Sequence, residues 1–410
     1  MEGRDNMEGF QLKRLFLYEV KKIAGRKIVL VSMVCAVLLI LFTFCLPLVG
    51  DYYVDGTRIG SNFEQFQIDE TYAKALDGRL IDDALIKEMQ EAYSNIDMEA
   101  YRYSLTEVYQ EEARPYSPIF VFVRQYTGLS GSIVVEYITG AKDMQERRMV
   151  LQEKRWKDSL LTEAEKAFWL EQENTLSTPM TYRYIGGYEK LFDACYTIGI
   201  VGLFVIAVCM SGVFPQEQVR RTDQLILSSK YGRKHIFRVK FLAGLLVSFL
   251  MMIVLVISAF GVAFSLYGAE GFDAAFQMYY VGSSLAVSVG EAVLIAYLME
   301  IVAVVFMAAV VMLLSEFLHN SVGTLAVATA IIVAPMMGSI PEEYRILSQL
   351  WSATPGDFVA IWSIFSERGV VLFGKVFTMW QAVPVGYLVV GIVFAVLAEK
   401  HFVKRQISGR

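Results

Sequence analysis

PQEQVRRTDQLILSSKYGRKHIFRVK, residues 215–240, joins two long apolar stretches of the chain. The segment has seven Lys and Arg but only two acidic residues, Glu217 and Asp223. Basic loops are retained in the cytosol when a membrane protein inserts. The segment is therefore expected to be a compact cytosolic connector between two membrane helices. A solvated loop that only sets the topology would have the same composition.

The composition of the 410 residues is typical of a membrane protein, with 55% hydrophobic and 19% charged residues. A hydrocarbon core roughly 30 Å thick takes about 20 apolar residues to cross as a helix. Six stretches are long and apolar enough, so we expect an all-α polytopic membrane protein with six transmembrane helices. The expected spans are residues 28–49, 191–214, 241–267, 292–315, 317–340 and 376–399.

The basic residues also predict the orientation of the chain. Residues 1–27 contain seven Lys and Arg and the tail from residue 400 contains four, whereas residues 268–291 contain none. Both termini are therefore expected in the cytosol, and residues 50–190 outside. The external connection 268–291 is uncharged from 274 to 290, which fits an interfacial or re-entrant helix.

Residues 1–27 show a second membrane signal. Apolar residues recur at helical spacing opposite a basic face, which is typical of an amphipathic helix lying along the inner interface. The apolar face comprises Leu12, Leu15, Phe16, Val20 and Ile23, and the basic face comprises Lys13, Arg14, Lys21 and Lys22. A cytosolic helix packed against a partner would give the same pattern.

Residues 50–190 are long enough to fold as a separate external domain, with 25 acidic and 16 basic residues. Three patterns of helical spacing predict that it is mainly helical. They are Leu85, Met89 and Tyr93; Tyr101, Leu105 and Tyr109; and Trp156, Leu160, Ala164 and Phe168. Thr162 and Glu165 have the spacing of a capping box, which begins a helix. Most aromatic residues are expected in its core, with a subset left to line a cleft for an amphipathic ligand. A second external segment is expected at 341–375.

Nothing in the sequence predicts catalysis or a metal centre. The three histidines, His235, His319 and His401, are scattered over separate segments, and their spacing is not that of a metal site. All four cysteines fall in predicted spans, so no disulfide is expected in the external domain. Residues 369–376 resemble a phosphate-binding loop, but Val376 replaces the Ser or Thr that would hold magnesium. The chain is therefore expected to have no catalytic residue, no ATPase site, and no cofactor or nucleic acid of its own.

The order of residues in the connector resembles the coupling segment of bacterial type II ABC exporter permeases. An acidic residue, an Arg-Thr pair, a Leu/Ile run, a Ser pair and a Gly-Arg pair follow one another. The layout of one span, an external insertion and five further spans is similar too. The residues concerned are Glu217, Arg221, Thr222, Leu225, Ile226, Ser228, Ser229, Gly232 and Arg233.

The resemblance implies a permease subunit of an ATP-driven exporter in a bacterial plasma membrane. It implies that a separate ABC ATPase subunit, which binds ATP and Mg2+, seats on the connector. A second permease copy or a related permease would complete the transporter. The substrate would be amphipathic: a peptide, a lipid or a drug-like molecule.

Two features inside the predicted spans have a functional interpretation. Glu300 lies in an apolar run, where an ionisable side chain is costly and marks either a substrate path or a contact with another span. Ala326, Ala330 and Ala334 form a small-residue stripe that permits close helix approach. Because the resemblance places the fifth span near the permease interface, the stripe is expected either at a dimer contact or in packing within one subunit.

Two other classes of function fit the sequence. A non-transporting sensor or resistance protein would bind an antimicrobial peptide through the external domain and contact a signalling partner through the connector. An ion-coupled secondary transporter would use ionisable residues in the spans, where Glu300 is central, but no inverted repeat is visible. Co-purification of an ATPase subunit distinguishes the exporter from both.

Overall fold

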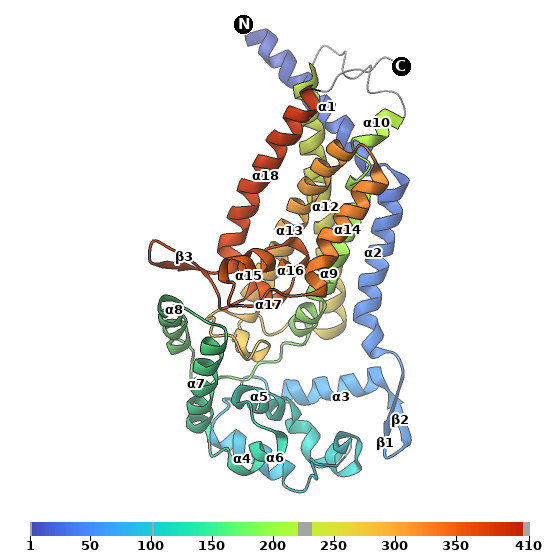
Figure 1. The fold of residues 1–410 in the computed structure, drawn as a ribbon. Helices are drawn as coiled ribbons and strands as arrows, with labels where there is room; N and C mark the ends of the chain where they lie inside the picture. The colour runs from blue at the N-terminus through green and yellow to red at the C-terminus, as the bar shows by residue number, and fades with distance from the viewer. Residues whose placement is uncertain (1, 101, 220–231, 405–410) are drawn as a thin grey trace.

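The computed structural model describes residues 2–100, 102–219 and 232–404 (Figure 1). Most of them are helical, in two parts: a bundle of long apolar helices and a smaller inserted domain. Among these residues, five helices are long and apolar enough to cross a membrane. They are α2 (Lys27–Cys45), α9 (Gly186–Met210), α12 (Gly232–Tyr267), α13 (Val289–Leu318) and α18 (Met379–Lys404). The expectation of a mainly helical, multi-pass membrane protein is confirmed.

A further apolar helix, α14 (Ser321–Met337), is shorter, with 17 residues. It packs against α9 and α13. The Asn320 side chain caps its first turn by accepting hydrogen bonds from the N–H groups of Val322 and Gly323. Because the turn before it is tight, α14 runs back along α13.

Helix α13 occupies the centre of the bundle, where it packs against α9, α12, α14 and α18. Ala296, Ala303 and Met307 on α13 are fully buried. Small side chains let helices approach closely, which matters in lipid because the hydrophobic effect does not draw apolar helices together there. Helices α9, α12, α14 and α18 are therefore arranged around α13.

Helix α12 begins at Gly232, nine residues before the predicted span at 241, and includes the basic stretch that we expected to stand before the helix. Two basic residues there are paired on the helix surface, Lys234 and Arg238 with Glu399 of α18, at 3.5 and 2.9 Å. Gly232 and Arg233 thus lie in the first turn of α12.

The N-terminal helix α1 (Glu2–Ala24) crosses one end of the bundle and packs against α12 (Figure 1). Of the predicted apolar face, Ile23 is buried, and Phe16 and Val20 are partly buried against the same core. We call this end, which also has α10 (Pro215–Val219) and the end of α18, the connector end. The opposite end, beside the inserted domain, is the insertion end.

The inserted domain follows a 3-10 turn, η1 (Leu46–Leu48), and has its own hydrophobic core. The pattern of Leu85, Met89 and Tyr93 predicted one helix correctly, since all three are buried on α4. Its regular elements are the antiparallel hairpin β1 (Asp51–Val54) and β2 (Thr57–Ser61), followed by α3 (Asn62–Ala75), α4 (Asp83–Tyr93), α5 (Ser117–Thr127), α6 (Gly131–Tyr137), α7 (Ala141–Asp158) and α8 (Glu163–Asn174).

Two predictions for this domain differ from the structure. The pattern of Trp156, Leu160, Ala164 and Phe168 is not one helix, because α7 ends before Leu160, whose backbone is left-handed at φ 51°, and α8 begins after it. Leu105 and Tyr109 do not share a regular helix: they lie in the 3-10 turn η2 (Tyr103–Leu105) and the π turn η3 (Tyr109–Ala113), which leads into η4 (Arg114–Tyr116). Arg102 has a left-handed backbone before η2, and Thr106 is extended after it, so helical hydrogen bonding cannot continue. The predicted capping box of Thr162 and Glu165 is confirmed and starts α8.

Residues 268–288 form a folded loop and not the interfacial or re-entrant helix expected between 274 and 290. Their one helical turn is η5 (Phe276–Met278), and Ala275 pairs with Ser288 in an isolated bridge. The buried Gln277 amide donates to the carbonyls of Ser283 and Leu285. Side chains thus satisfy backbone groups that a helix would have paired internally.

Residues 339–378 form a second folded segment at the insertion end (Figure 1). The stretch that resembles a phosphate-binding loop falls on a hairpin here, whereas such a loop joins a strand to a helix. The elements are α15 (Arg345–Ser352), α16 (Pro355–Phe358), α17 (Ile361–Ile364), β3 (Val370–Leu372) and β4 (Lys375–Phe377).

Candidate functional site

The predicted coupling residues are only partly within the described chain. Glu217 lies on α10, and Gly232 and Arg233 open α12. The remaining ones, Arg221, Thr222, Leu225, Ile226, Ser228 and Ser229, lie outside the described residues. The structure therefore places the two flanks of the connector but not its middle.

Glu217 is buried at the connector end, with 6% of its surface exposed. Its carboxylate is paired with Lys22 of α1 and Lys240 of α12. Lys240 is itself 1% exposed, and its ammonium lies 5.4 Å from the centre of the Phe214 ring. Lys22 also contacts Glu19 at 3.2 Å. Glu217 thus joins three helices, α1, α10 and α12.

This ion-pair cluster fixes the two flanks of the connector to each other. Removing one partner of a buried pair costs about 3–5 kcal/mol, because the other charge is left uncompensated. In the sequence, Lys22 indicates topology and a basic helix face, Lys240 indicates topology, and no local pattern pairs either with Glu217. The contacts could not be predicted, because Lys22 and Lys240 lie on different helices from Glu217, and Lys22 is also distant from it along the chain.

Glu300 is fully buried on α13. One carboxylate oxygen lies 3.0 Å from the thiol of Cys195 on α9. The neighbouring Tyr297 hydroxyl donates to the carbonyl of Leu191, also on α9, at 2.9 Å. Of the two predicted roles, the contact with another span is therefore present in this conformation.

The alanine stripe faces away from the bundle. Ala326, Ala330 and Ala334 are exposed, whereas Thr324 and Ala328 of α14 are buried against the other helices. The alternative of packing within one subunit is therefore wrong. A small-residue face is left open on the outside of α14.

Two of the three histidines lie together, so their predicted scatter is also wrong. His401 of α18 and His319, at the end of α13, have ring centres 5.7 Å apart. Glu316 approaches the same point, with Oε1 3.2 Å from Nδ1 of His401. The close packing of the ends of α13 and α18 brings these residues together, and spacing along the chain gives no sign of it.

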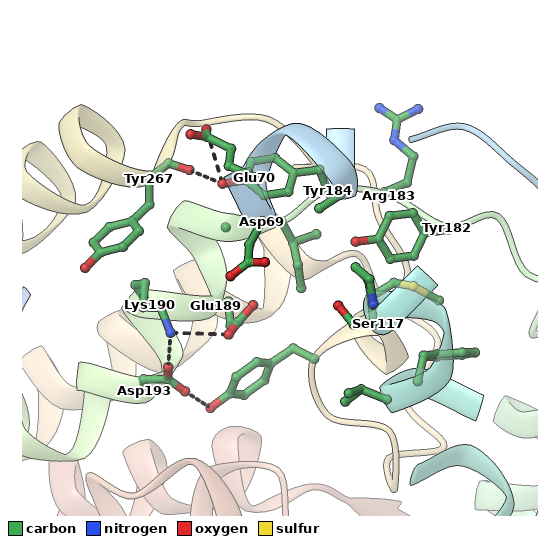
Figure 2. A pocket seen from close by; sticks show the side chains of 18 of the residues that line it. Asp69, Glu70, Ser117, Tyr182, Arg183, Tyr184, Glu189, Lys190, Asp193 and Tyr267 are labelled. Atoms are coloured by element: carbon green, nitrogen blue, oxygen red, sulfur yellow. Dashed lines mark hydrogen bonds and ion pairs between the residues drawn. The ribbon is translucent and has the colours of Figure 1, made fainter. Parts of the chain in front are cut away.

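A cavity of about 580 Å³ lies between the inserted domain and the insertion end of the bundle (Figure 2). Aromatic rings and carboxylates dominate its wall. The rings are Phe66, Phe122, Tyr182, Tyr184, Tyr267 and Tyr279, and the charged residues are Asp69, Glu70, Glu189, Asp193, Arg183 and Lys190. Four of these rings, Phe66, Phe122, Tyr182 and Tyr184, come from the predicted external domain, so a subset of its aromatic residues does line a cavity.

The polar groups of this cavity are held in place by one another. Lys190 contacts Glu189 at 3.3 Å and Asp193 at 3.0 Å (Figure 2). The Tyr279 hydroxyl lies 3.2 Å from Asp193, and the Tyr184 hydroxyl donates to the Tyr267 carbonyl at 3.0 Å. Burial raises the pKa of Tyr184, so its hydroxyl stays neutral. Four carboxylates against two basic groups make the wall acidic overall.

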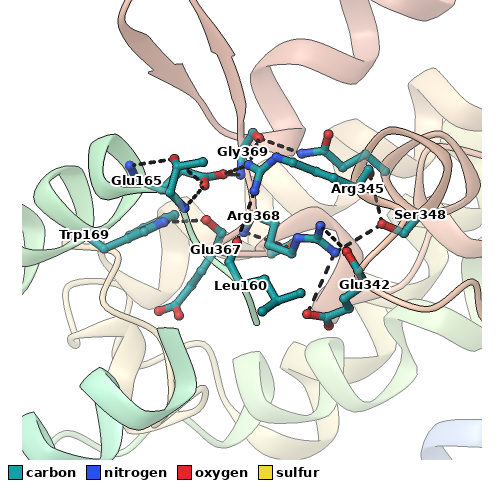
Figure 3. A network of polar contacts seen from close by, with 12 residues as sticks. Leu160, Glu165, Trp169, Glu342, Arg345, Ser348, Glu367, Arg368 and Gly369 are labelled. Carbon is teal, nitrogen blue, oxygen red and sulfur yellow. Dashed lines mark hydrogen bonds and ion pairs between the residues drawn. The ribbon is translucent and has the colours of Figure 1, made fainter. Parts of the chain in front are cut away.

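A polar network ties the inserted domain to the segment 339–378 (Figure 3). The buried Glu165 carboxylate is paired with Arg345 and accepts a hydrogen bond from Gly369 N–H at 2.9 Å. The Trp169 indole donates to the carbonyl of Glu367 at 2.6 Å. Burial raises the pKa of the Glu367 carboxyl to about 7.

Arg148 of α7 makes a second tie, to the loop 268–288. It is 1% exposed, and its guanidinium pairs with Glu173 of α8, with Nη2 3.1 Å from Oε2. The same guanidinium donates to the carbonyls of Val281 and of Ser283, the latter at 2.8 Å. The Tyr126 ring centre lies 4.6 Å from it. The inserted domain is thus joined to two segments of the bundle by arginine contacts, of which that of Arg148 is buried.

The comparisons with known proteins add no family to this description: no family model matches the chain, and no curated protein matches it.

Proposed function

We propose that the chain is the membrane-spanning permease subunit of an ATP-driven ABC exporter in a bacterial plasma membrane. In this proposal α14 is a sixth span, the inserted domain is extracellular, and the connector end and both termini are cytosolic. A separate ATPase subunit binds ATP and Mg2+, and the permease moves an amphipathic substrate. The layout of apolar helices and the basic connector support this assignment.

The observation on which the proposal mainly rests is the ion-pair cluster of Glu217, Lys22 and Lys240. A partner that binds and moves the connector would pull on both of its flanks. Because Glu217 and Lys240 are paired with each other and with α1, that motion reaches α1, α10 and α12 together. A loop that only sets topology has no need of a buried charge cluster at its base.

The cavity at the insertion end supports an amphipathic substrate. Aromatic faces bind apolar groups and attract cations, and the carboxylates favour a positive charge on the ligand. The cavity lies between the inserted domain and the ends of α9 and α12. In an exporter this is where the outward path would open.

A second permease copy is supported by the outward-facing alanine stripe. In lipid, small residues on an exposed helix face allow a close approach by another helix. Ala326, Ala330 and Ala334 provide such a face on α14. We therefore propose that α14 contacts a second permease copy or a related permease.

The test is co-purification of the ATPase with wild-type permease and with two connector variants. Leu225→Asp puts a charge into the Leu/Ile run of the connector, which would dock on the ATPase, and Glu217→Gln breaks the ion-pair cluster at the base of the connector. We expect Leu225→Asp to weaken ATPase association by about tenfold or more, because burial of a leucine side chain is worth about 1.5–3 kcal/mol. Glu217→Gln should retain the ATPase but uncouple ATP hydrolysis from transport in liposomes.

Lys13→Ala, at an exposed position of α1, is the matched control and should bind and couple like wild type. Equal association and coupling in all variants would refute the proposal. Protein that recovers no ATPase, yet binds a cationic peptide through the inserted domain, would favour the non-transporting sensor.

A further inference from the structure

A cluster of two histidines and one glutamate lies at the connector end of the bundle. One ligand atom from each of Glu316, His319 and His401 can be chosen so that all three lie within 4.8 Å of one another. Glu316 is fully buried, His401 is partly buried and His319 is exposed. The cluster thus has a fixed buried side and an open side.

Local structure holds each member of the cluster. Glu316 is in the last turn of α13, and His319 directly follows the helix with a left-handed backbone, φ 52°. This conformation turns the chain back so that Asn320 can cap α14. The His401 ring stacks on Phe317, with ring centres 4.4 Å apart. Two of the three side chains are therefore oriented by packing.

The distances suit a transition-metal ion. Zinc bonds of about 2.1 Å at tetrahedral angles place ligand atoms about 3.4 Å apart. The contact of 3.2 Å between Glu316 and His401 is already close to this value. The ligand atom of His319 lies within 4.8 Å of the other two, so the gap left to close is at most about 1.4 Å. Two imidazoles and one carboxylate form a recurrent zinc set that leaves a fourth position open.

We propose that Glu316, His319 and His401 bind a divalent transition-metal ion, with zinc the best match to the ligand set. The site is accessible from solvent through His319. Imidazole ligands favour zinc and its neighbours over magnesium or calcium, which prefer oxygen. This inference concerns a different site from the connector contacts and does not depend on the proposed transport.

A bound ion would join the turn between α13 and α14 to α18. The same region adjoins the base of the connector, since the Ser315 hydroxyl donates to the carbonyl of Ser211 at 2.9 Å. Ser211 follows α9 directly and precedes α10. The metal would therefore brace the part of the bundle from which the connector leaves.

The experiment is a zinc titration of the full-length protein in detergent, purified with an affinity tag that contains no histidine. After treatment with EDTA, Zn2+ binding is measured by competition with a chromogenic chelator. We expect one high-affinity ion per chain. His319→Asn and His401→Ala should each weaken binding by at least about tenfold, since even partners of metal ligands have effects of this size.

His235→Ala is the matched control, because it removes the remaining histidine of the chain. It should bind zinc like wild type. Asparagine is chosen at position 319 because it tolerates the left-handed backbone, and size-exclusion profiles without metal check that each variant is folded. The absorption spectrum of bound Co2+ gives a second readout of tetrahedral nitrogen and oxygen ligation. Wild-type affinity and stoichiometry in a His319→Asn/His401→Ala double variant would overturn the proposal, as would no zinc binding by the wild type.

Discussion

Arg148 offers the sharpest test of how the inserted domain is attached to the bundle. Its guanidinium contacts Glu173 within the domain and two carbonyls of the loop 268–288. Replacement by methionine keeps a similar volume but removes the charge and every donor. Glu173, 2% exposed, is then left buried without its partner.

The expected loss follows from the chemistry of buried pairs. Leaving one charge uncompensated costs about 3–5 kcal/mol, and each carbonyl that loses a donor adds about 1 kcal/mol. With two carbonyls the total is about 5–7 kcal/mol, which lowers the Tm of a unit of 150–250 residues by roughly 10–28 °C. Arg148→Met/Glu173→Met should lose less than Arg148→Met alone, because no unpaired charge remains.

The assay is thermal unfolding of the full-length protein in detergent, followed by tryptophan fluorescence, with hydrogen exchange of residues 281–283. Arg148→Met should lower Tm and speed exchange in this loop. Lys142→Ala on the same helix is the control. The Lys142 side chain is 92% exposed and lies 3.8 Å from Glu146, so its effect should be below about 1 kcal/mol. A Tm fall for Arg148→Met no larger than for Lys142→Ala would refute the reasoning, as would additive losses in the double variant.

Three further predictions concern the span, the polar network and the topology. Glu300→Gln should preserve assembly and change substrate-stimulated ATP hydrolysis in the reconstituted complex; normal stimulation by a poorly assembled variant would assign Glu300 to packing alone. Because the pKa of Glu367 is raised from 4.5 to about 7, its stabilising contribution is complete below 4.5 and is lost as pH rises through 7. Glu367→Gln should therefore flatten the dependence of Tm on pH across that window; an unchanged profile would contradict it. A cysteine at Ser94, in a background without native cysteines, should react with an impermeant maleimide on intact cells; protection of this cysteine would contradict the predicted extracellular position of the inserted domain.

The sequence predicted those parts of the fold that depend on a repeat along one segment. Leu85, Met89 and Tyr93 recur every four residues, so their helix and its buried face were predictable. The bundle helices were predictable as well, because each lies in one continuous apolar run of about the length that a membrane span needs. The start of α12 was not predictable. It includes Lys234 and Arg238, whose partner Glu399 lies far along the chain.

The candidate sites depend on contacts between segments, and here spacing along the chain was a poor guide. Glu217 is an expected site residue, but its burial follows from Lys22 and Lys240 on two other helices. His319 and His401 meet because α13 and α18 pack side by side. The outward face of Ala326 is set by the rotation of α14 about its own axis, which no local pattern fixes.

The short length of α14 has a consequence for the surrounding lipid. At about 1.5 Å per residue, its 17 residues extend about 26 Å, less than the roughly 30 Å of a typical hydrocarbon core. Where α14 crosses as the sixth span, the bilayer beside it can adapt by thinning by about 4 Å, at a cost of a fraction of a kcal/mol per Å. Two copies that meet along their alanine faces would share one thinned region instead of making two. Thicker membranes would thereby favour pairing of the subunits, and bilayers of increasing acyl-chain length would reveal this as a rising dimer fraction.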